Sequence, residues 1–272
     1  TNFNTGRLIG PGLSGVLIAA YGTGFSFLLN GISYLGVITA LLFIRERELF
    51  REDINRNSTK IRQGINYVKA RPDILAVMFT VFFATSFGLN FNIFNTMMAT
   101  AVFDKSAAEY GALGSILAVG SLSGAIVSAR LEKKRDPKFV MKGAMLFSLV
   151  LICSAVAPNY LTYALVLPLI GFIALVTFIA ANTLVQLRTD SAIRGRVMGI
   201  YLTVFLGGTP IVSPLIGWMT QQIGTRYTIV ICGAISFTAA LITYLKFKDR
   251  TEAPESFLVN DVLEAAYEDK KD

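Results

Sequence analysis

Histidine is absent from this chain of 272 residues, and cysteine occurs only at Cys153 and Cys232. Zinc sites and disulfide frameworks need several such side chains at defined spacings, so we expect no metal and no other cofactor. The centres of the long apolar stretches also lack Asp and Glu. Because a membrane-embedded enzyme needs a positioned acid, base or nucleophile, the sequence predicts that the protein is not an enzyme.

Charge is missing from long parts of the chain. Six segments of about twenty residues or more contain no Asp, Glu, Lys or Arg: Leu8–Ile44, Ile74–Phe103, Tyr110–Ala129, Gly143–Leu187, Val197–Thr225 and Tyr227–Leu245. A helix needs about 20 apolar residues to cross a bilayer, and a charge at its centre costs about 3 kcal/mol. The chain is therefore predicted to be an all-α integral membrane protein.

Two of these segments are too long for a single crossing, and each contains a turn signal. Gly22-Thr23-Gly24 divides the first segment, and Pro158-Asn159 divides the fourth. Eight transmembrane helices result, near residues 3–21, 24–44, 74–102, 110–131, 138–157, 160–187, 197–221 and 227–245.

Basic residues are distributed unevenly over the loops between these eight helices. When successive loops alternate sides, Lys105 and Arg226 fall on one side and the rest of the 25 lysines and arginines fall on the other. The side rich in basic residues is expected to be cytoplasmic. The net charge of +7 then reflects topology, and a nucleic-acid partner is not expected. We expect a multi-pass protein of the plasma (inner) membrane, with the bilayer as its surroundings.

Glycines of the first two helices recur in the last two. A shift of about 202 residues places Gly15 on Gly217, Gly22 on Gly224 and Gly31 on Gly233. This pattern indicates a parallel repeat, although chance similarity between glycine-rich apolar segments stays open.

A repeat unit of six helices predicts the domain organisation. Residues 1–44 are the last two helices of an N-terminal half, 45–72 a basic cytoplasmic linker, 73–247 a C-terminal six-helix half and 248–272 an acidic cytoplasmic tail. Four front helices of an expected twelve are then missing. Within the linker, Ile61, Ile65 and Val68 recur at helical spacing, which is typical of a short amphipathic helix on the inner leaflet. A solvated charged linker stays open as the alternative.

Three motifs carry a resemblance to a known family. They are Gly6-x-x-x-Gly10-Pro11-x-x-Ser14-Gly15 in the first helix, Gly64-Ile65-x-Tyr67-Val68 before Pro72, and Asp190 followed by Arg194-Gly195-Arg196-Val197-Met198-Gly199. Together with the basic linker they resemble the major facilitator superfamily, and within it a bacterial efflux branch. The resemblance implies a major facilitator type bundle of twelve helices in two halves.

The resemblance also implies a function. It indicates a secondary active transporter that exports a small organic substrate, such as a drug or a siderophore-like molecule, by alternating access. A coupling proton, and hence an antiporter, stays open because no carrier residue is visible. The alternative is a non-transporting membrane scaffold or a degenerate transporter copy.

The resemblance assigns roles to two groups of residues. Gly6, Gly10, Pro11 and Gly15 would form a conformational motif that restrains opening, with small-residue packing as the alternative. A second group, Asp190, Arg194, Gly195 and Arg196, would form the cytoplasmic turn before the eleventh helix.

Polar residues inside the helices are amides and hydroxyls, which cannot face lipid without a partner. The resemblance places some of them at a substrate cavity: Asn90, Phe91, Asn92, Asn95, Asn182 and Gln186. The last two are four residues apart and share a helix face. Hydrogen bonding between helices is the alternative role.

Small residues and prolines predict local packing. Gly120, Gly124 and Ser128 follow at four-residue steps and predict a closely packed helix face. Pro210 and Pro214 come after two glycines and predict a bend, with a gating role or a static kink both open.

The topology is testable with cysteine accessibility. In a variant without Cys153 and Cys232, a membrane-impermeant thiol reagent applied to intact cells should label Lys105→Cys and leave Lys134→Cys unlabelled. Permeabilised cells should show both labels, which controls for local burial. Labelling of the Lys134→Cys variant alone in intact cells would overturn the orientation.

Overall fold

The computed structural model describes residues 17, 21, 24, 25, 27–43, 61–130, 136–191 and 193–247. Its elements are α2 (Ile61–Ala70), α3 (Pro72–Phe83), η3 (Ala84–Gly88), α4 (Phe91–Met97), η4 (Met98–Val102), α5 (Ala107–Arg130), α6 (Pro137–Ala155), α7 (Tyr160–Arg188), α8 (Arg194–Gly207), α9 (Thr209–Ile223) and α10 (Thr225–Phe247). No strand occurs in these described ranges, so the predicted all-α class is confirmed there.

Six helical segments in the described ranges are long and apolar enough to cross a membrane. They are Pro72–Val102, Ala107–Ser128, Pro137–Ala155, Tyr160–Arg188, Arg194–Ile223 and Thr225–Phe247. They correspond to the last six of the eight helices predicted from the sequence. The first helical segment begins two residues earlier than predicted, which brings Asp73 inside it.

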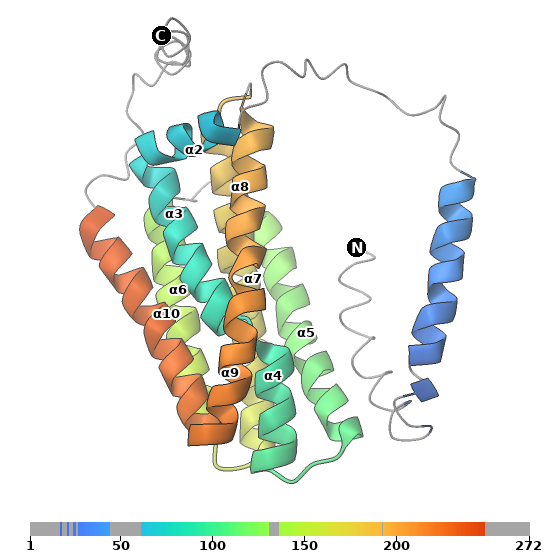
Figure 1. The fold of residues 1–272 in the computed structure, drawn as a ribbon. Coiled ribbons are helices and arrows are strands. Elements are labelled where there is room, and N and C mark those ends of the chain that lie inside the picture. The colour runs from blue at the N-terminus through green and yellow to red at the C-terminus, as the bar shows by residue number, and fades with distance from the viewer. Residues whose placement is uncertain are drawn as a thin grey trace, which may run out of the picture.

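The predicted helix at 24–44 corresponds to a shorter apolar helix, Phe27–Leu42. It stands apart from the bundle in Figure 1, and all its residues are exposed. Most of the predicted first helix, including the conformational motif Gly6, Gly10, Pro11 and Gly15, lies outside the described residues. The acidic tail from residue 248 lies outside them as well.

Side-chain caps explain where two of the helices begin. The carboxylate of Asp136 accepts a hydrogen bond from the Phe139 amide (2.6 Å) at the start of α6. The Asn159 side chain accepts one from the Thr162 amide (2.9 Å) at the start of α7. Each bond satisfies a backbone donor that has no partner within the helix. The turn predicted at Pro158-Asn159 is thereby confirmed.

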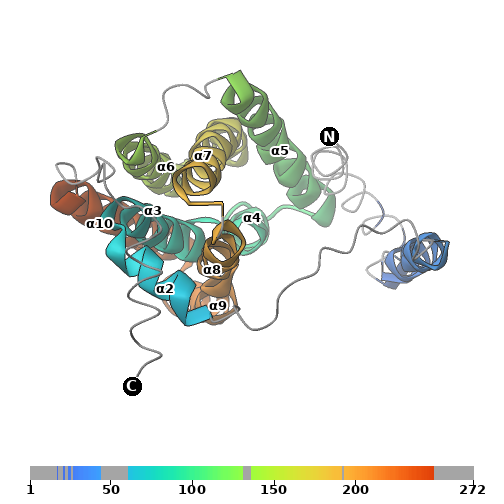
Figure 2. The same ribbon diagram turned by 90° about the horizontal axis from the view of Figure 1, so that it is seen from above.

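The helices form one bundle in which α7 packs against α5 and α6, while α10 packs against α6 and α3. Figure 2 shows α5, α6 and α7 along one side, and α10, α3 and α8 along the other. Aromatic rings connect the two sides through the interior. Phe147 contacts Phe91 and Phe178 (centroids 6.3 and 5.8 Å apart), and Phe205 contacts Phe178 and Tyr201 (5.7 and 6.1 Å).

The contact between α5 and α7 depends on small residues. A Cβ atom at Gly120 would overlap the Pro168 carbonyl, and one at Gly124 would lie 2.5 Å from the Phe172 carbonyl. Gly171 approaches the α5 backbone in the same way, because its Cβ would overlap the Leu117 carbonyl. The close-packed face predicted at Gly120 and Gly124 is confirmed, since the two backbones approach where no side chain intervenes.

Two of the membrane-length segments are broken near their middles. The first changes from α3 to the π-helical η3 and then breaks at Leu89, before α4. The other breaks at Gly208, between α8 and α9, before the predicted bend at Pro210 and Pro214. The breaks meet, because a Cβ atom at Gly208 would overlap the Ser86 hydroxyl of η3. A side chain at Gly208 would therefore separate the two broken segments.

The linker helix predicted from Ile61, Ile65 and Val68 is present as α2. Gly64, Tyr67 and Val68 are buried against the bundle, whereas Ile61 and Ile65 are exposed. The absence of a side chain at Gly64 lets the α8 side chains approach closely. One face of α2 therefore packs on the bundle, and Ile61 and Ile65 remain available for the predicted contact with the inner leaflet.

Substituting Gly120 tests the contact between α5 and α7. Gly120→Ala should lower the free energy of unfolding by about 1–3 kcal/mol, because the added methyl group forces the helices apart. Thermal unfolding in detergent measures the change. The matched control is Gly217→Ala in α9, where no atom lies within 4 Å of an added Cβ and helix propensity favours alanine by up to about 1 kcal/mol. Equal melting temperatures for the two variants would contradict this account.

Candidate functional site

A buried amide positions the start of α4. Asn90, which is 5% exposed, donates from Nδ2 to the Ser86 carbonyl of η3 (2.7 Å). Its Oδ1 accepts a hydrogen bond from the hydroxyl of Ser213 on α9 (2.6 Å). Backbone groups released by a break inside a membrane need a partner within the protein. Asn90 supplies one and joins the two broken segments at the same point.

A second buried amide fixes the middle of α4. Asn95, which is 2% exposed, accepts a hydrogen bond from the hydroxyl of Tyr163 on α7 (2.8 Å). Phe91 lies in the core against Phe147. Asn90, Phe91 and Asn95 were predicted to line a cavity. In this structure their partners lie inside the chain, as in the alternative role of joining helices.

The opposite face of α4 is polar and open. Asn92 is exposed and makes no side-chain hydrogen bond within the described part of the chain. Thr96 and Thr100 follow at four-residue steps, and each hydroxyl donates to the carbonyl four residues earlier (2.6 and 2.8 Å). We call Asn92, Thr96 and Thr100 the α4 polar stripe. Sequence analysis named only Asn92, although the four-residue spacing could have revealed the two threonines.

Asn182 and Gln186 share one face of α7, as predicted. The Gln186 amide donates to Asn182 Oδ1 (2.5 Å), and Gln186 is exposed. Both lie toward the end of α7 opposite to Tyr163, which contacts α4. At 1.5 Å per residue, Gln186 lies about 35 Å along the helix from Tyr163. The six predicted cavity residues therefore do not form one pocket, and their exposed members lie toward opposite ends of the bundle.

A buried group of charges, which was not predicted from the sequence, lies at the end of the bundle near α2. Asp73, in the first turn of α3, is fully buried, and Arg71 is 6% exposed. The Arg71 guanidinium binds both carboxylate oxygens of Asp73 (2.9 and 2.8 Å). Arg188, the last residue of α7, binds the same carboxylate (3.1 Å). An Asp one residue after Pro72, at the start of an apolar segment, was the available signal.

Tyr67 connects this cluster to the linker helix. Arg71 donates to the Tyr67 hydroxyl (3.0 Å), and that hydroxyl donates to the Arg188 carbonyl (3.4 Å). Arg71 also donates to this carbonyl (3.2 Å), which lies at the end of α7 and lacks a helical partner. The hydrogen bonds that Arg71 donates to the Asp73 carboxylate raise the pKa of Arg71 above its ordinary value, although burial opposes the rise. We call Tyr67, Arg71, Asp73 and Arg188 the charge cluster.

The predicted turn residues lie beside the charge cluster. Arg194 donates to the Thr189 carbonyl just after α7 (3.3–3.4 Å), and Arg196 donates to Gln63 of α2 (2.8 Å). The Asp190 carbonyl accepts from the Ile193 amide (3.3 Å) and closes the turn. No atom lies within 4 Å of a Cβ added at Gly195. The structure thus brings Asp190, Arg194 and Arg196 together at the junction of α2, α7 and α8.

Metal ligands do not gather in the part of the chain that the structure describes. No group of three or more His, Cys, Asp or Glu side chains occurs there in an arrangement that could hold a metal ion. Cys153 is exposed and Cys232 is buried, and both are free thiols. The candidate functional features are therefore the α4 polar stripe, the Asn182–Gln186 pair and the charge cluster.

Removing the acid of the charge cluster should destabilise the protein. Asp73→Asn removes the carboxylate that Arg71 and Arg188 both bind, and breaking a buried ion pair in this way costs about 3–5 kcal/mol. Thermal unfolding in detergent should show a markedly lower midpoint. Glu109→Gln is the matched control, because the Glu109–Lys105 pair is half exposed (39% and 37%) and should contribute little. A midpoint for Asp73→Asn equal to that of the control would refute the structural role.

Comparisons with known proteins cover nearly the whole chain. The family described as transmembrane secretion effector matches residues 1–266. The enterobactin exporter EntS of Shigella flexneri is 23% identical over 216 residues, which cover 78% of this chain and 50% of that protein. The chain thus spans about half the length of this curated relative. With its membrane-length helices, the chain belongs to the transmembrane secretion effector family, within the major facilitator superfamily.

Proposed function

We propose that the protein exports a small organic molecule, of drug or siderophore-like chemistry, across the plasma (inner) membrane. The family, and the similarity to the enterobactin exporter of Shigella flexneri, support transport out of the cell. Residues 73–247 act as one six-helix half, and alternating access exposes the substrate path to each side in turn.

The observation that carries this proposal is the α4 polar stripe. Asn92 is exposed on a membrane-length helix, where an amide in hydrocarbon lacks hydrogen-bond partners. Thr96 and Thr100 donate to backbone carbonyls and extend its polar face into η4. The stripe therefore faces a water-filled path or another part of the transporter. Asn182 and Gln186 are also amides on a membrane-length helix, and they lie near the end of α7 that is far from α4. In this proposal the stripe and the Asn182–Gln186 pair mark the two ends of one substrate path.

The charge cluster has a separate role in this proposal. It joins the linker helix to the ends of two membrane-length helices of the same half, and so holds the linker against that half as it moves. The distribution of basic residues predicts that this end, with the linker and the C-terminal tail, is cytoplasmic. The conformational motif Gly6, Gly10, Pro11 and Gly15 would restrain opening from the other half.

A coupling proton would need a carboxylate. Among the described membrane-length segments the carboxylates are Asp73 and Glu109, and of these only Asp73 is buried. Arg71 and Arg188 both bind the Asp73 carboxylate, and such guanidinium partners favour its charged form. Asp73 therefore has a structural role in this proposal, and a coupling proton would need a carboxylate outside the described membrane-length segments.

Substitutions of Asn92 and of Asn90, two residues earlier, test the substrate path. Asn92→Leu should lower export about tenfold, because loss of one hydrogen bond to the substrate costs about 1.4 kcal/mol. Its melting temperature should change little, because Asn92 has no side-chain partner in the described chain. Asn90→Leu should instead lower the melting temperature, because it removes the bond to Ser213. Export of enterobactin and of ethidium from cells measures the first effect.

Controls separate transport from folding and from the alternative function. Asn92→Gln retains an amide and should retain most of the export. Gln186→Leu tests the other end of the path and should alter apparent affinity more than stability. If Asn92→Leu lowers the melting temperature but leaves export unchanged, the stripe joins helices and lines no path. If neither probe is exported by the unmodified protein, the alternative of a non-transporting scaffold or degenerate copy is favoured.

A further inference from the structure

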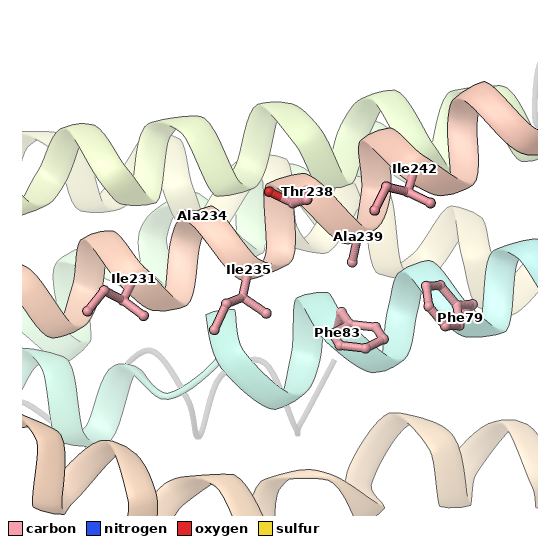
Figure 3. Close-up of a pocket in the computed structure, with 8 residues that line it drawn as sticks. All are labelled: Phe79, Phe83, Ile231, Ala234, Ile235, Thr238, Ala239 and Ile242. Atoms are coloured by element: carbon pink, nitrogen blue, oxygen red, sulfur yellow. The ribbon is translucent and has the colours of Figure 1, made fainter.

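An apolar groove runs between α3 and α10 (Figure 3). Its volume is about 460 Å³. It is lined by two rings of α3 and six side chains of α10: Phe79, Phe83, Ile231, Ala234, Ile235, Thr238, Ala239 and Ile242. Thr238 alone among these eight carries a hydroxyl group. The groove is separate from the α4 polar stripe and from the charge cluster.

The hollow has a definite structural cause. The rings of Phe79 and Phe83, with centroids 4.8 Å apart, stand opposite the small side chains Ala234 and Ala239. The hydroxyl of buried Ser236 on α10 donates to the Phe83 carbonyl of α3 (3.1 Å), which fixes the two helices against each other beside the groove. That carbonyl lies where α3 changes into η3. The groove is therefore built into the backbone of the bundle.

The dimensions of the groove suit a lipid chain. Along α10, Ile231 and Ile242 are about 16 Å apart at 1.5 Å per residue. Half the thickness of a bilayer's hydrocarbon core is about 15 Å. An occupant must therefore be apolar, narrow and about as long as one leaflet is deep, which describes an acyl chain.

Positive charge lies at one end of the groove. Lys246 is exposed and follows Ile242 by four residues, so it lies on the same face of α10 one turn beyond the groove. Lys142, also exposed, lies with its ammonium group 5.7 Å from the ring centre of Tyr244 at the same end of α10. Basic sites between transmembrane helices on the cytoplasmic side attract anionic lipid headgroups.

We propose that this groove binds an anionic phospholipid of the cytoplasmic leaflet, with one acyl chain between α3 and α10 and the headgroup phosphate against Lys246. Lys142 reaches Tyr244 on the opposite face of α10 and is not part of this site. The bound lipid fills the space that Ala234 and Ala239 leave and joins α3 to α10 along half the membrane. The proposal concerns lipid binding and does not depend on the transported substrate.

Native mass spectrometry of the full chain tests the acyl-chain site. After delipidation, the protein is offered phosphatidylglycerol or phosphatidylcholine with identical chains. The unmodified protein should retain phosphatidylglycerol preferentially. Thr238→Phe should abolish retention of both lipids, because the new ring fills the groove. Ala234→Leu should reduce the retention of both lipids for the same reason. Leu165→Phe is the matched control, since Leu165 is 70% exposed and does not line the groove. Undiminished retention by both groove variants would overturn the site.

Lysine variants test the headgroup. Lys246→Gln should retain acyl-chain binding but reduce the preference for phosphatidylglycerol by about fivefold, the factor for one basic residue near an anionic surface. Lys105→Gln, on the opposite end of the bundle, should keep the full preference. Equal binding of both lipids by the unmodified protein, or an unchanged preference in Lys246→Gln, would refute the assignment of an anionic headgroup.

Discussion

The carboxylate of Asp73 is the constraint on which the end of the bundle near α2 depends. A charge buried at the start of a membrane-length helix is tolerated only with partners, and Arg71 and Arg188 supply them from the linker end and from the end of α7. The Tyr67 hydroxyl, which belongs to the same cluster, donates a hydrogen bond to the Arg188 carbonyl at the end of α7. The positions of α2, α3 and α7, and of the turn that leads into α8, follow from this one buried group.

Two buried amides of the bundle also find their hydrogen-bond partners within the protein. Where the first membrane-length segment breaks, Asn90 bonds to the η3 backbone and to Ser213, and Asn95 bonds to Tyr163. Each amide removes a polar group from contact with lipid and fixes α4 against a different helix. Because these contacts hold one face of α4, the opposite face with Asn92 is fixed in orientation. A rigidly presented polar stripe is what a transporter needs for selective contact with its substrate.

The sequence predicted the membrane-length helices well because their signal is the absence of charge over long runs, which does not depend on packing. The turn at Pro158-Asn159 and the helix α2 followed from equally local signals. Which amides face inward was not predictable, because the π-helical η3 and the break at Leu89 rotate α4 relative to a regular helix through the same residues. Asp73 was missed for a related reason, since only the fold brings Arg188 to it across 115 residues of chain.

The account rests most directly on the claim that Asn92 faces water while Asn90 faces the core. A membrane-impermeant thiol reagent measures this in a chain that lacks Cys153 and Cys232. The account predicts rapid modification of Asn92→Cys, slowed by a transported substrate. It predicts no modification of Asn90→Cys, and none of Leu165→Cys on the lipid-facing surface. An unreactive Asn92→Cys in a folded protein, with reagent applied from both sides of the membrane, would contradict the proposed substrate path.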